Sequence, residues 1–222
     1  MDTKNTNSLE PRKTPIQARS VVTVDAIFEA TVQVLLSEGP QRLTTTRVAD
    51  RAGVSVGTVY QYYPNKQSLL YAVLEQHLLR VTTSVEQACE VLRHQPLADM
   101  VVGLVKAFVD AKTAHVEESK ALYLVAAELD VAKLVEQISE RMRKATASML
   151  GSAVDARFDD LSMVSFMVMS AMVGPTRAVL EGRAPPKMLQ ALRMQLVTLC
   201  DAYLSRLAIP QSTRKTRAVA GA

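Results

Sequence analysis

Residues 43–70 constrain the fold more than any other stretch of the chain. They combine three threonines, apolar residues at helical spacing, Gly53, Ser55 and a proline stop at Pro64. Hydroxyl side chains accept hydrogen bonds at helix starts, and glycine permits the left-handed turn that ends a helix. The residue before a proline is pushed out of helical geometry. The pattern therefore predicts a short helix that ends at Gly53 and a second one up to Tyr62, which is a helix-turn-helix.

The second short helix has one side chain suited to face inward and several suited to face DNA. Val59 is the expected anchor, while Thr58 can hydrogen-bond a base edge or touch a thymine methyl group. Gln61 can pair with adenine through two hydrogen bonds, and the hydroxyls of Tyr60 and Tyr63 are expected at phosphate reach. Two short helices around a glycine also occur in all-α proteins that do not bind DNA. The pattern alone therefore leaves DNA binding open.

Residues 22–70 resemble the DNA-binding domain of the TetR family of bacterial transcription regulators, and they make up about a quarter of the 222 residues. The matching motifs are Leu35-Leu36-Ser37-Glu38-Gly39, Thr45-Thr46 with Val48-Ala49, Ala52-Gly53-Val54-Ser55, Gly57-Thr58-Val59-Tyr60, and Tyr63-Pro64-Asn65-Lys66 with Leu69-Leu70. Val56 stands where the family often has lysine, Tyr62-Tyr63 replaces a common His-Phe pair, and Gln67 replaces a common acidic residue. These departures bear on which operator sequence is read.

The resemblance implies contacts to double-stranded operator DNA. The contact residues that it implies are Thr45, Ser55, Val56, Gly57, Thr58, Tyr60, Gln61, Tyr62 and Lys66. We add Thr46 and Arg47 to these candidates, with Arg47 as a phosphate contact. The resemblance also implies a homodimer, which would carry two reading helices to successive major grooves about 34–36 Å apart.

Positive charge gathers at the two ends of the chain. The net charge is +4, and the four basic residues from Arg206 onward are accompanied by no acidic residue. Four more basic residues precede the first helix, where two prolines argue against helix. Such segments suit phosphate attraction, although a solvated tail is the plainer interpretation. The expected organisation is a flexible basic arm over 1–19, a helix-turn-helix domain over 20–65, a helical ligand-binding and dimerisation domain over 66–208, and a basic C-terminal tail over 209–222.

Beyond Pro64 the sequence predicts helices throughout, with no convincing β-alternation and no internal repeat. The expected fold is all-α, with an N-terminal three-helix helix-turn-helix domain joined by a long helix to a larger helical domain. The expected helices after the helix-turn-helix span about 66–93, 97–114, 117–129, 131–151, 161–180 and 187–207. Gly174-Pro175 should kink or locally unwind the helix that contains it.

The last two expected helices carry apolar residues at three- and four-residue spacing, which is typical of a packed helical seam. The helix over 161–180 is apolar on more than one face and needs cover on several sides. A four-helix interface between two protomers would supply that cover, as the TetR resemblance also implies, while packing within one subunit is the alternative. The expected interface residues are Leu161, Val164, Val168, Met172, Leu189, Leu192, Leu196, Leu199 and Tyr203.

The middle of the chain is expected to bind a small, largely apolar effector, because methionine and aromatic side chains suit an adaptable pocket. The candidate pocket residues are Phe108, Tyr123, Met142, Met163, Phe166 and Met167, although such residues at helical spacing are more often core. Glu128 and Asp130 could pair with a cationic ligand or simply be exposed carboxylates at a helix end.

A ligand-responsive repressor that leaves its operator when the effector binds is the function that the sequence favours. A DNA-binding regulator switched by a protein partner, or an activator, with no internal ligand site, stays open as the alternative. An enzyme has poor support, because the three histidines lack metal spacing and there is no phosphate loop or G-x-S-x-G elbow. We therefore expect no cofactor and no metal.

The apolar runs are broken by charges, and none is expected to be long enough to span a bilayer. The polar N-terminus does not resemble a secretory signal, so the expected location is the cytoplasm with no membrane partner. Cys89 and Cys200 lie far apart in the sequence, and each is expected to be a small buried hydrophobe rather than half of a disulfide.

Overall fold

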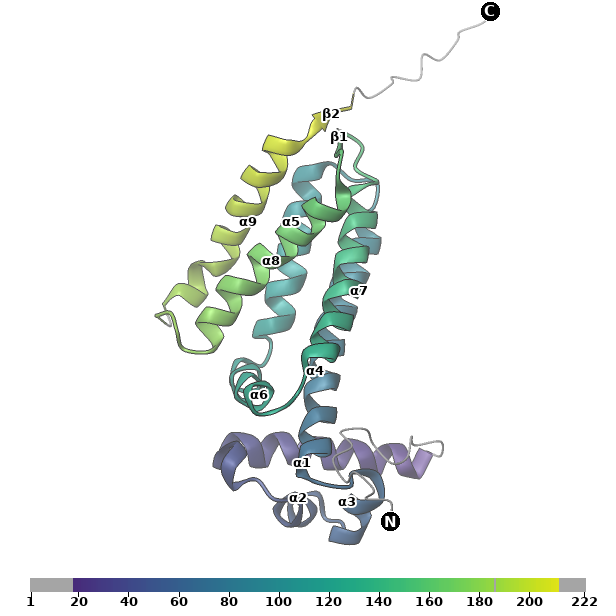
Figure 1. Ribbon diagram of the computed structural model, residues 1–222, viewed down its shortest axis with the longest axis vertical. Coiled ribbons are helices and arrows are strands. Elements are labelled where there is room, and N and C mark those ends of the chain that lie inside the picture. Colours follow the sequence, from purple (N-terminus) through teal and green to yellow (C-terminus); the bar gives the residue numbers. More distant parts are fainter. Residues whose placement is uncertain (1–17, 186, 212–222) are drawn as a thin grey trace, which may run out of the picture. The chain divides into compact units, whose positions relative to one another are not determined.

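A computed structural model describes residues 18–185 and 187–211, which are almost entirely helical. Figure 1 shows the order of the elements along the chain. They are α1 (Ala18–Arg42), α2 (Thr45–Ala52), α3 (Val56–Tyr62), α4 (Lys66–Val91), α5 (Leu97–Thr113), α6 (Val116–Glu128), α7 (Ala132–Leu150), β1 (Ala156–Arg157), α8 (Leu161–Leu180), α9 (Met188–Leu207) and β2 (Ile209–Pro210). The expected all-α class and helical order are confirmed, with helix ends that agree to within about two residues after Pro64.

The described residues form two compact units. Unit 1 contains residues up to 80 together with 112–137, and unit 2 contains 81–111 together with 138 onward. Helix α4 contributes to both units, and α6 belongs with the N-terminal helices. The domain boundary expected at residue 65 stays a prediction, since this division groups residues only by their contacts. The basic segments over 1–17 and 212–222 lie outside the described residues.

The helix-turn-helix is determined by helix caps and a turn that involve residues close together in the sequence. The Thr44 hydroxyl accepts a hydrogen bond from the Arg47 amide at the start of α2, at 3.3 Å. Gly53 ends that helix in the left-handed region, with φ of 67°, and the following Val54 amide donates to the Ala49 carbonyl at 3.0 Å. The Ser55 hydroxyl then caps α3.

The core of unit 1 joins α1, α2, α3 and the first part of α4, with α2 and α3 packed below α1 in Figure 1. Val59 from α3 is fully buried in this core, as expected for the anchor of the reading helix. Leu122 and Val125 of α6 are buried in the same core, and α6 packs on α1. Helix α1 is kinked at Gly39, whose backbone is not helical (φ 79°, ψ 168°), so the segment consists of two helical pieces joined at this residue.

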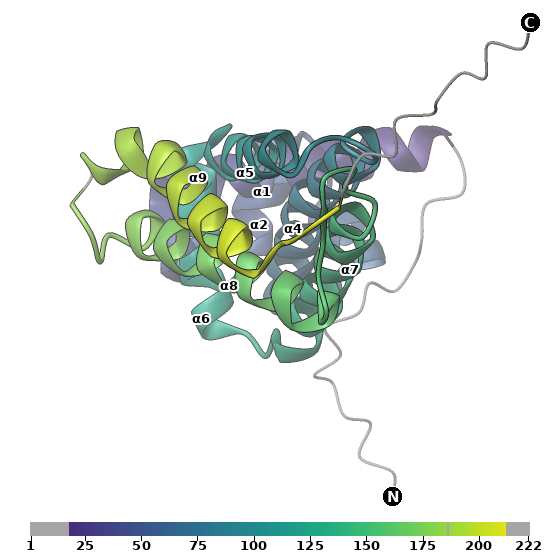
Figure 2. The ribbon, with the colours of Figure 1, turned by 90° about the horizontal axis from the view of Figure 1, so that it is seen from above.

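Unit 2 is built around α8 and α9, which lie side by side in Figures 1 and 2. Their facing sides are buried, together with apolar residues of α5 and α7. Helix α8 stays helical from Leu161 to Leu180, so Gly174-Pro175 does not locally unwind it, while a kink there stays a prediction. A short antiparallel pair that the sequence did not predict joins Ala156 to Pro210 and Arg157 to Ile209.

The expectation that no apolar stretch is long enough to span a bilayer is wrong for one helix. Helix α8 is long and apolar enough to cross a bilayer by length and composition, with a mean hydropathy of 1.4 and only Arg177 as a charged residue. However, an entire face of α8 packs inside unit 2, from Val164 through Met172 to Leu180. Its apolar composition is accounted for by this packing within the protein.

Candidate DNA-binding surface and a buried charged cluster

Helix α3 presents an open outer face opposite its buried anchor, Val59. Ser55, Gly57, Tyr60 and Gln61 are exposed on this face. A β-carbon at Gly57 would meet only the Ser55 hydroxyl, at 3.6 Å, so the backbone of the helix start is accessible. A short helix with a bare, small-residue start can approach base edges closely in the major groove.

Two hydroxyl groups on α3 are held by each other. The Ser55 and Thr58 hydroxyl oxygens lie 2.8 Å apart, and the Ser55 oxygen also accepts a hydrogen bond from the Thr58 amide at 3.0 Å. The Thr58 side chain is therefore fixed before any DNA arrives, which reduces the entropy that a base contact would cost. Val56 and Tyr62, the remaining candidates on this helix, are half-buried, while Thr46 on α2 is exposed.

Thr45 is buried and not exposed on the candidate DNA-binding surface. Its side chain is buried, and its hydroxyl donates to the Tyr60 hydroxyl oxygen at 3.2 Å. The Tyr60 ring itself is 43% exposed and keeps its own proton available for an acceptor such as a phosphate oxygen. Thr45 thus holds Tyr60 in position, a role that the sequence pattern did not reveal.

Tyr63 does not lie at the surface, contrary to the expectation that its hydroxyl would reach phosphate. It is buried, and its ring packs edge-on against Phe28 with ring centres 6.0 Å apart. Burial raises the pKa of its phenol to about 12, with smaller contributions from Tyr62 and Asp25. Tyr63 is a core residue that ends α3 in extended geometry before Pro64.

The two basic candidates at the edge of the surface are both engaged within the protein. Arg47 pairs with Glu38 and also donates to the Arg42 carbonyl at 3.1 Å. The Lys66 ammonium donates to the Pro40 carbonyl at 2.6 Å, which ties α4 to the end of α1. Each retains further donor protons, so a phosphate contact can be added to these bonds.

A cluster of charged and polar residues within unit 1 was not predicted from the sequence. Its members, which we call the Lys112 cluster, are His77, Arg80, Lys112, Glu118 and Tyr123, from α4, α5 and α6. The Glu118 carboxylate accepts hydrogen bonds from the Arg80 guanidinium and from His77 Nδ1, the latter at 3.3 Å. The hydrogen bonds to Glu118 join residues 38 and 41 positions apart in the sequence, which no local periodicity could have indicated.

The pKa values in this cluster follow from burial and pairing. Hydrogen bonding from His77, together with Arg80, holds the pKa of Glu118 below its ordinary value. Burial lowers the pKa of His77, so its imidazole is neutral at pH 7. Lys112 is 7% exposed, and burial lowers the pKa of its ammonium to about 8. At neutral pH, Lys112 is therefore still mostly charged.

The predicted pocket residues do not all face an interior space. Phe108 and Met142 are buried in the core of unit 2, and Tyr123 is half-buried in unit 1. Met163, Phe166 and Met167 are instead 54%, 54% and 43% exposed. These three share the outer face of α8, because the inner face is the one that packs within unit 2.

Five of the nine predicted interface residues are buried within the single chain, in contrast to the three exposed pocket candidates on α8. Of this set, Val164, Val168, Met172, Leu192 and Leu196 are buried within their own subunit, where they form the seam between α8 and α9. Leu161, Leu189 and Tyr203 are half-buried, and Leu199 is 49% exposed. The spacing of the five buried residues thus reflects packing within the subunit, whereas contact of Leu161, Leu189, Leu199 and Tyr203 with a second protomer stays a prediction.

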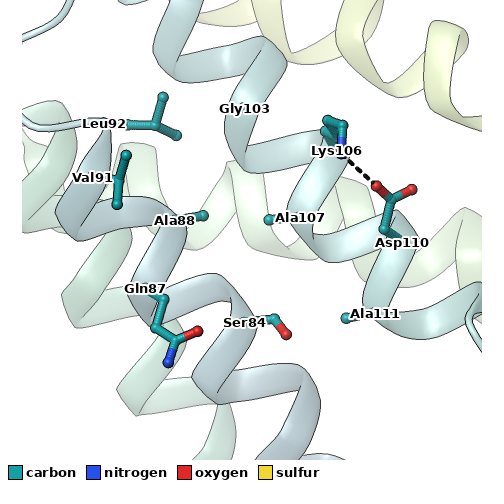
Figure 3. Close-up of a pocket in the computed structure, with 10 residues that line it drawn as sticks. All are labelled: Ser84, Gln87, Ala88, Val91, Leu92, Gly103, Lys106, Ala107, Asp110 and Ala111. Carbon is teal, nitrogen blue, oxygen red and sulfur yellow. Dashed lines mark hydrogen bonds and ion pairs between the residues drawn. The ribbon is translucent and has the colours of Figure 1, made fainter.

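A shallow groove lies between α4 and α5 in unit 2 (Figure 3). Its volume is about 500 Å³, and Lys106 and Asp110 form an ion pair of 2.9 Å along its edge. Small side chains form its floor, and a β-carbon at Gly103 would lie 2.6 Å from Leu92. The groove thus reflects close helix packing. Among the described residues, no group of three or more His, Cys, Asp or Glu side chains is arranged to hold a metal ion.

The two cysteines are buried and unpaired, as the sequence predicted. Burial raises the pKa of each thiol to about 11. Glu128, considered above as a partner for a cationic ligand, accepts a hydrogen bond of 2.6 Å from Gln41. This bond adds a polar contact between α6 and the end of α1.

Two protein-family models match separate parts of the chain. The model described as bacterial regulatory proteins, tetR family, matches residues 27–73, and the one described as tetracyclin repressor-like, C-terminal domain, matches residues 96–204. The HTH-type transcriptional repressor KstR of Mycobacterium tuberculosis is 34% identical over 62 residues, which are 28% of this chain and 28% of the repressor. YvkB of Bacillus subtilis, an HTH-type transcriptional regulator, is 36% identical over 61 residues, which are 28% of this chain and 32% of that protein. The matched region thus spans about a third or less of these relatives.

Solved structures resemble a much larger part of the chain. A protein of Mesorhizobium loti described as a TetR-family transcriptional regulator has a TM-score of 0.69 at 17% identity, over 87% of this chain and 100% of that one. SmeT, the repressor of the Stenotrophomonas maltophilia multidrug efflux pump SmeDEF, has a TM-score of 0.64 at 17% identity, over 85% of this chain and 93% of SmeT. At such identities the likeness shows the fold.

The open face of α3 and the helical body behind it define a helix-turn-helix DNA-binding regulator of transcription. Family matches to both the N-terminal and the C-terminal parts agree with the fold likeness. The chain belongs to the TetR family of bacterial transcription regulators.

Proposed function

We propose that this protein is a repressor that binds its operator through α3 and leaves it when a small ligand binds. The observation that carries the proposal is the exposed face of α3, where Gly57 and Gln61 are open and Thr58 is held by Ser55. Similarity to repressors such as KstR supports repression over activation. A regulator of this kind acts on the chromosome, so we place it in the cytoplasm.

Operator binding requires two copies of α3, and we propose that the outer face of α8 supplies the dimer contact. Met163, Phe166 and Met167 are large apolar side chains with about half of their surface exposed in the single chain. Leu199 adds a further exposed apolar residue from α9. A contiguous apolar face of this kind is typical of a protein–protein contact, and a second copy would present the same face in return.

The response to a ligand is supported by how α6 is held. Helix α6 packs on α1 through Leu122 and Val125, and Gln41 bonds to Glu128 at the far end of α6. A change in α6 would therefore act directly on the helices that position α3. The ligand must bind more tightly to the form with low DNA affinity, since equal binding to both forms would shift nothing.

The proposal is tested by fluorescence anisotropy with the full chain and duplex DNA from the intergenic region upstream of its gene, over a series of salt concentrations. Thr58→Ala and Gln61→Ala should weaken specific binding by roughly 1–3 kcal/mol each and leave random DNA almost unaffected. Arg47→Ala is the matched comparison, because the loss of a phosphate contact should weaken both DNAs together and reduce the salt slope. Equal losses on specific and random DNA for all three variants would contradict base reading by α3.

A further inference from the structure

Lys112 carries a buried charge that the protein itself does not balance. It lies in the last turn of α5 with 7% of its surface exposed. Within the described part of the chain, no carboxylate lies within ion-pair distance of its ammonium group. Buried charges in proteins are ordinarily paired, because removing an ion from water without a partner is strongly unfavourable. The Lys112 ammonium lacks a carboxylate partner and, since no fully buried side-chain nitrogen in the described residues is left without a partner, it keeps some access to solvent, from which an anion could reach it.

Glu118, the acidic residue of the Lys112 cluster, is hydrogen-bonded to residues other than Lys112. Glu118 accepts from both Arg80 and His77 through the same carboxylate oxygen, Oε1. The cluster then contains two cations, Arg80 and Lys112, one anion, Glu118, and a neutral imidazole, His77. Its net charge is one positive unit, located on the residue that is most buried among the charged members. A single additional negative charge would neutralise it.

One contact of Lys112 involves its ammonium group, and another involves its backbone. It lies over the face of the Tyr123 ring, 5.2 Å from the ring centre, in a cation–π contact. The Lys112 carbonyl accepts a hydrogen bond of 2.8 Å from the buried Ser119 hydroxyl, which secures the backbone at the end of α5. The aromatic ring also offers an apolar wall next to the charge, which suits a ligand that has a hydrocarbon or aromatic body.

We propose that Lys112 is the anchor of a binding site in unit 1 for a small monocarboxylic acid with an apolar body. The site takes its charge recognition from Lys112 and its apolar contact from Tyr123. This inference rests on the proposed function, because it names the chemical class of the effector. The ligand carboxylate lies against the Lys112 ammonium, on α5, while Glu118 and Tyr123 are on α6, the helix that packs on α1.

The test uses octanoate and benzoate as probes, with octanamide and benzamide as neutral probes of the same shape. Thermal unfolding of the full chain is followed with each probe at pH 7. Both carboxylates should raise the melting temperature more than their amides do. Lys112→Met should weaken carboxylate affinity roughly tenfold or more, since it removes a charge-assisted hydrogen bond. Lys112→Arg should retain most of the affinity.

Lys120→Met is the matched control, because Lys120 is an exposed lysine of α6 that pairs with Glu117 at 2.7 Å. It should leave carboxylate binding unchanged. Equal shifts from acids and amides, no shift from either carboxylate, or carboxylate binding that survives Lys112→Met would each overturn the proposed site.

Operator release is measured in parallel to separate the two proposals. If carboxylates bind through Lys112 but leave DNA affinity unchanged, the site stands and the proposed ligand response fails. If carboxylates release DNA equally from wild type and Lys112→Met, the response stands and the site assigned here is wrong.

Discussion

Replacing Lys112 by methionine should stabilise the protein without its ligand, and the gain should depend on pH. Burial lowers the pKa of this ammonium from 10.5 to about 8, and each unit of pKa corresponds to about 1.36 kcal/mol. The difference of 2.5 units therefore amounts to roughly 3 kcal/mol of lost stability at pH 7, where both folded and unfolded chains carry the proton. Because Lys112 is 7% exposed, water screens this penalty little.

The sign of the pH dependence follows from proton binding. Between pH 8 and pH 10.5, the unfolded chain binds more protons at Lys112 than the folded chain does, so wild-type stability rises with pH in this window. Lys112→Met lacks that rise. Its advantage over wild type should fall from about 3 kcal/mol at pH 7 to about 1 kcal/mol at pH 10. Contributions from Tyr63, Cys89 and Cys200 are common to both proteins and cancel in the comparison.

Urea unfolding at pH 7 and pH 10 measures this difference through the transition midpoints, provided that the slopes agree. Lys120→Met, at an exposed position, should show no comparable gain at either pH. A Lys112→Met protein that is less stable than wild type at pH 7, or one whose gain is the same at both pH values, would show that the lysine is balanced within the fold.

Three further predictions concern the stability of the helix-turn-helix, DNA binding and assembly. Gly53→Ala should cost roughly 1 kcal/mol of stability, measured by urea unfolding, because φ is 67° there while a β-carbon would meet nothing within 4 Å. Thr45→Val and Tyr60→Phe should each weaken DNA binding and be non-additive when combined, since one hydrogen bond joins them; additive losses in anisotropy titrations would argue against this coupling. Phe166→Glu should convert the proposed dimer to monomer in sedimentation velocity at unchanged helicity, and an intact dimer would show that the outer face of α8 is not the interface.

The sequence predicted the helix-turn-helix well because its determinants are local. Thr44, Gly53 and Ser55 each act on amides or dihedral angles within a few residues, so their roles can be inferred from order alone. The direction of Val59 could likewise be predicted, because α3 is short and amphipathic. Tyr63 could not be placed in the same way, since its burial depends on Phe28 in α1.

The orientation of α8 was beyond sequence reasoning for a physical reason. Val164 and Phe166 are both apolar, and a helix that is apolar around most of its circumference gives no signal of which side packs inward. The Lys112 cluster was missed because its members are distant in sequence. A lysine in the last turn of a helix is ordinarily solvated, whereas this one is buried with its ammonium over the ring of Tyr123 in α6.

The buried thiols of Cys89 and Cys200 have a practical and a physiological consequence. With pKa values of about 11, only about one thiol in ten thousand is ionised at pH 7, and the thiolate is the form that reacts. Mild peroxide should therefore leave DNA binding unchanged, which anisotropy titrations before and after treatment would show. A cysteine introduced in place of the exposed Val22, outside the candidate DNA contacts, should accept a maleimide dye selectively in the otherwise natural chain, so that DNA binding can be followed directly.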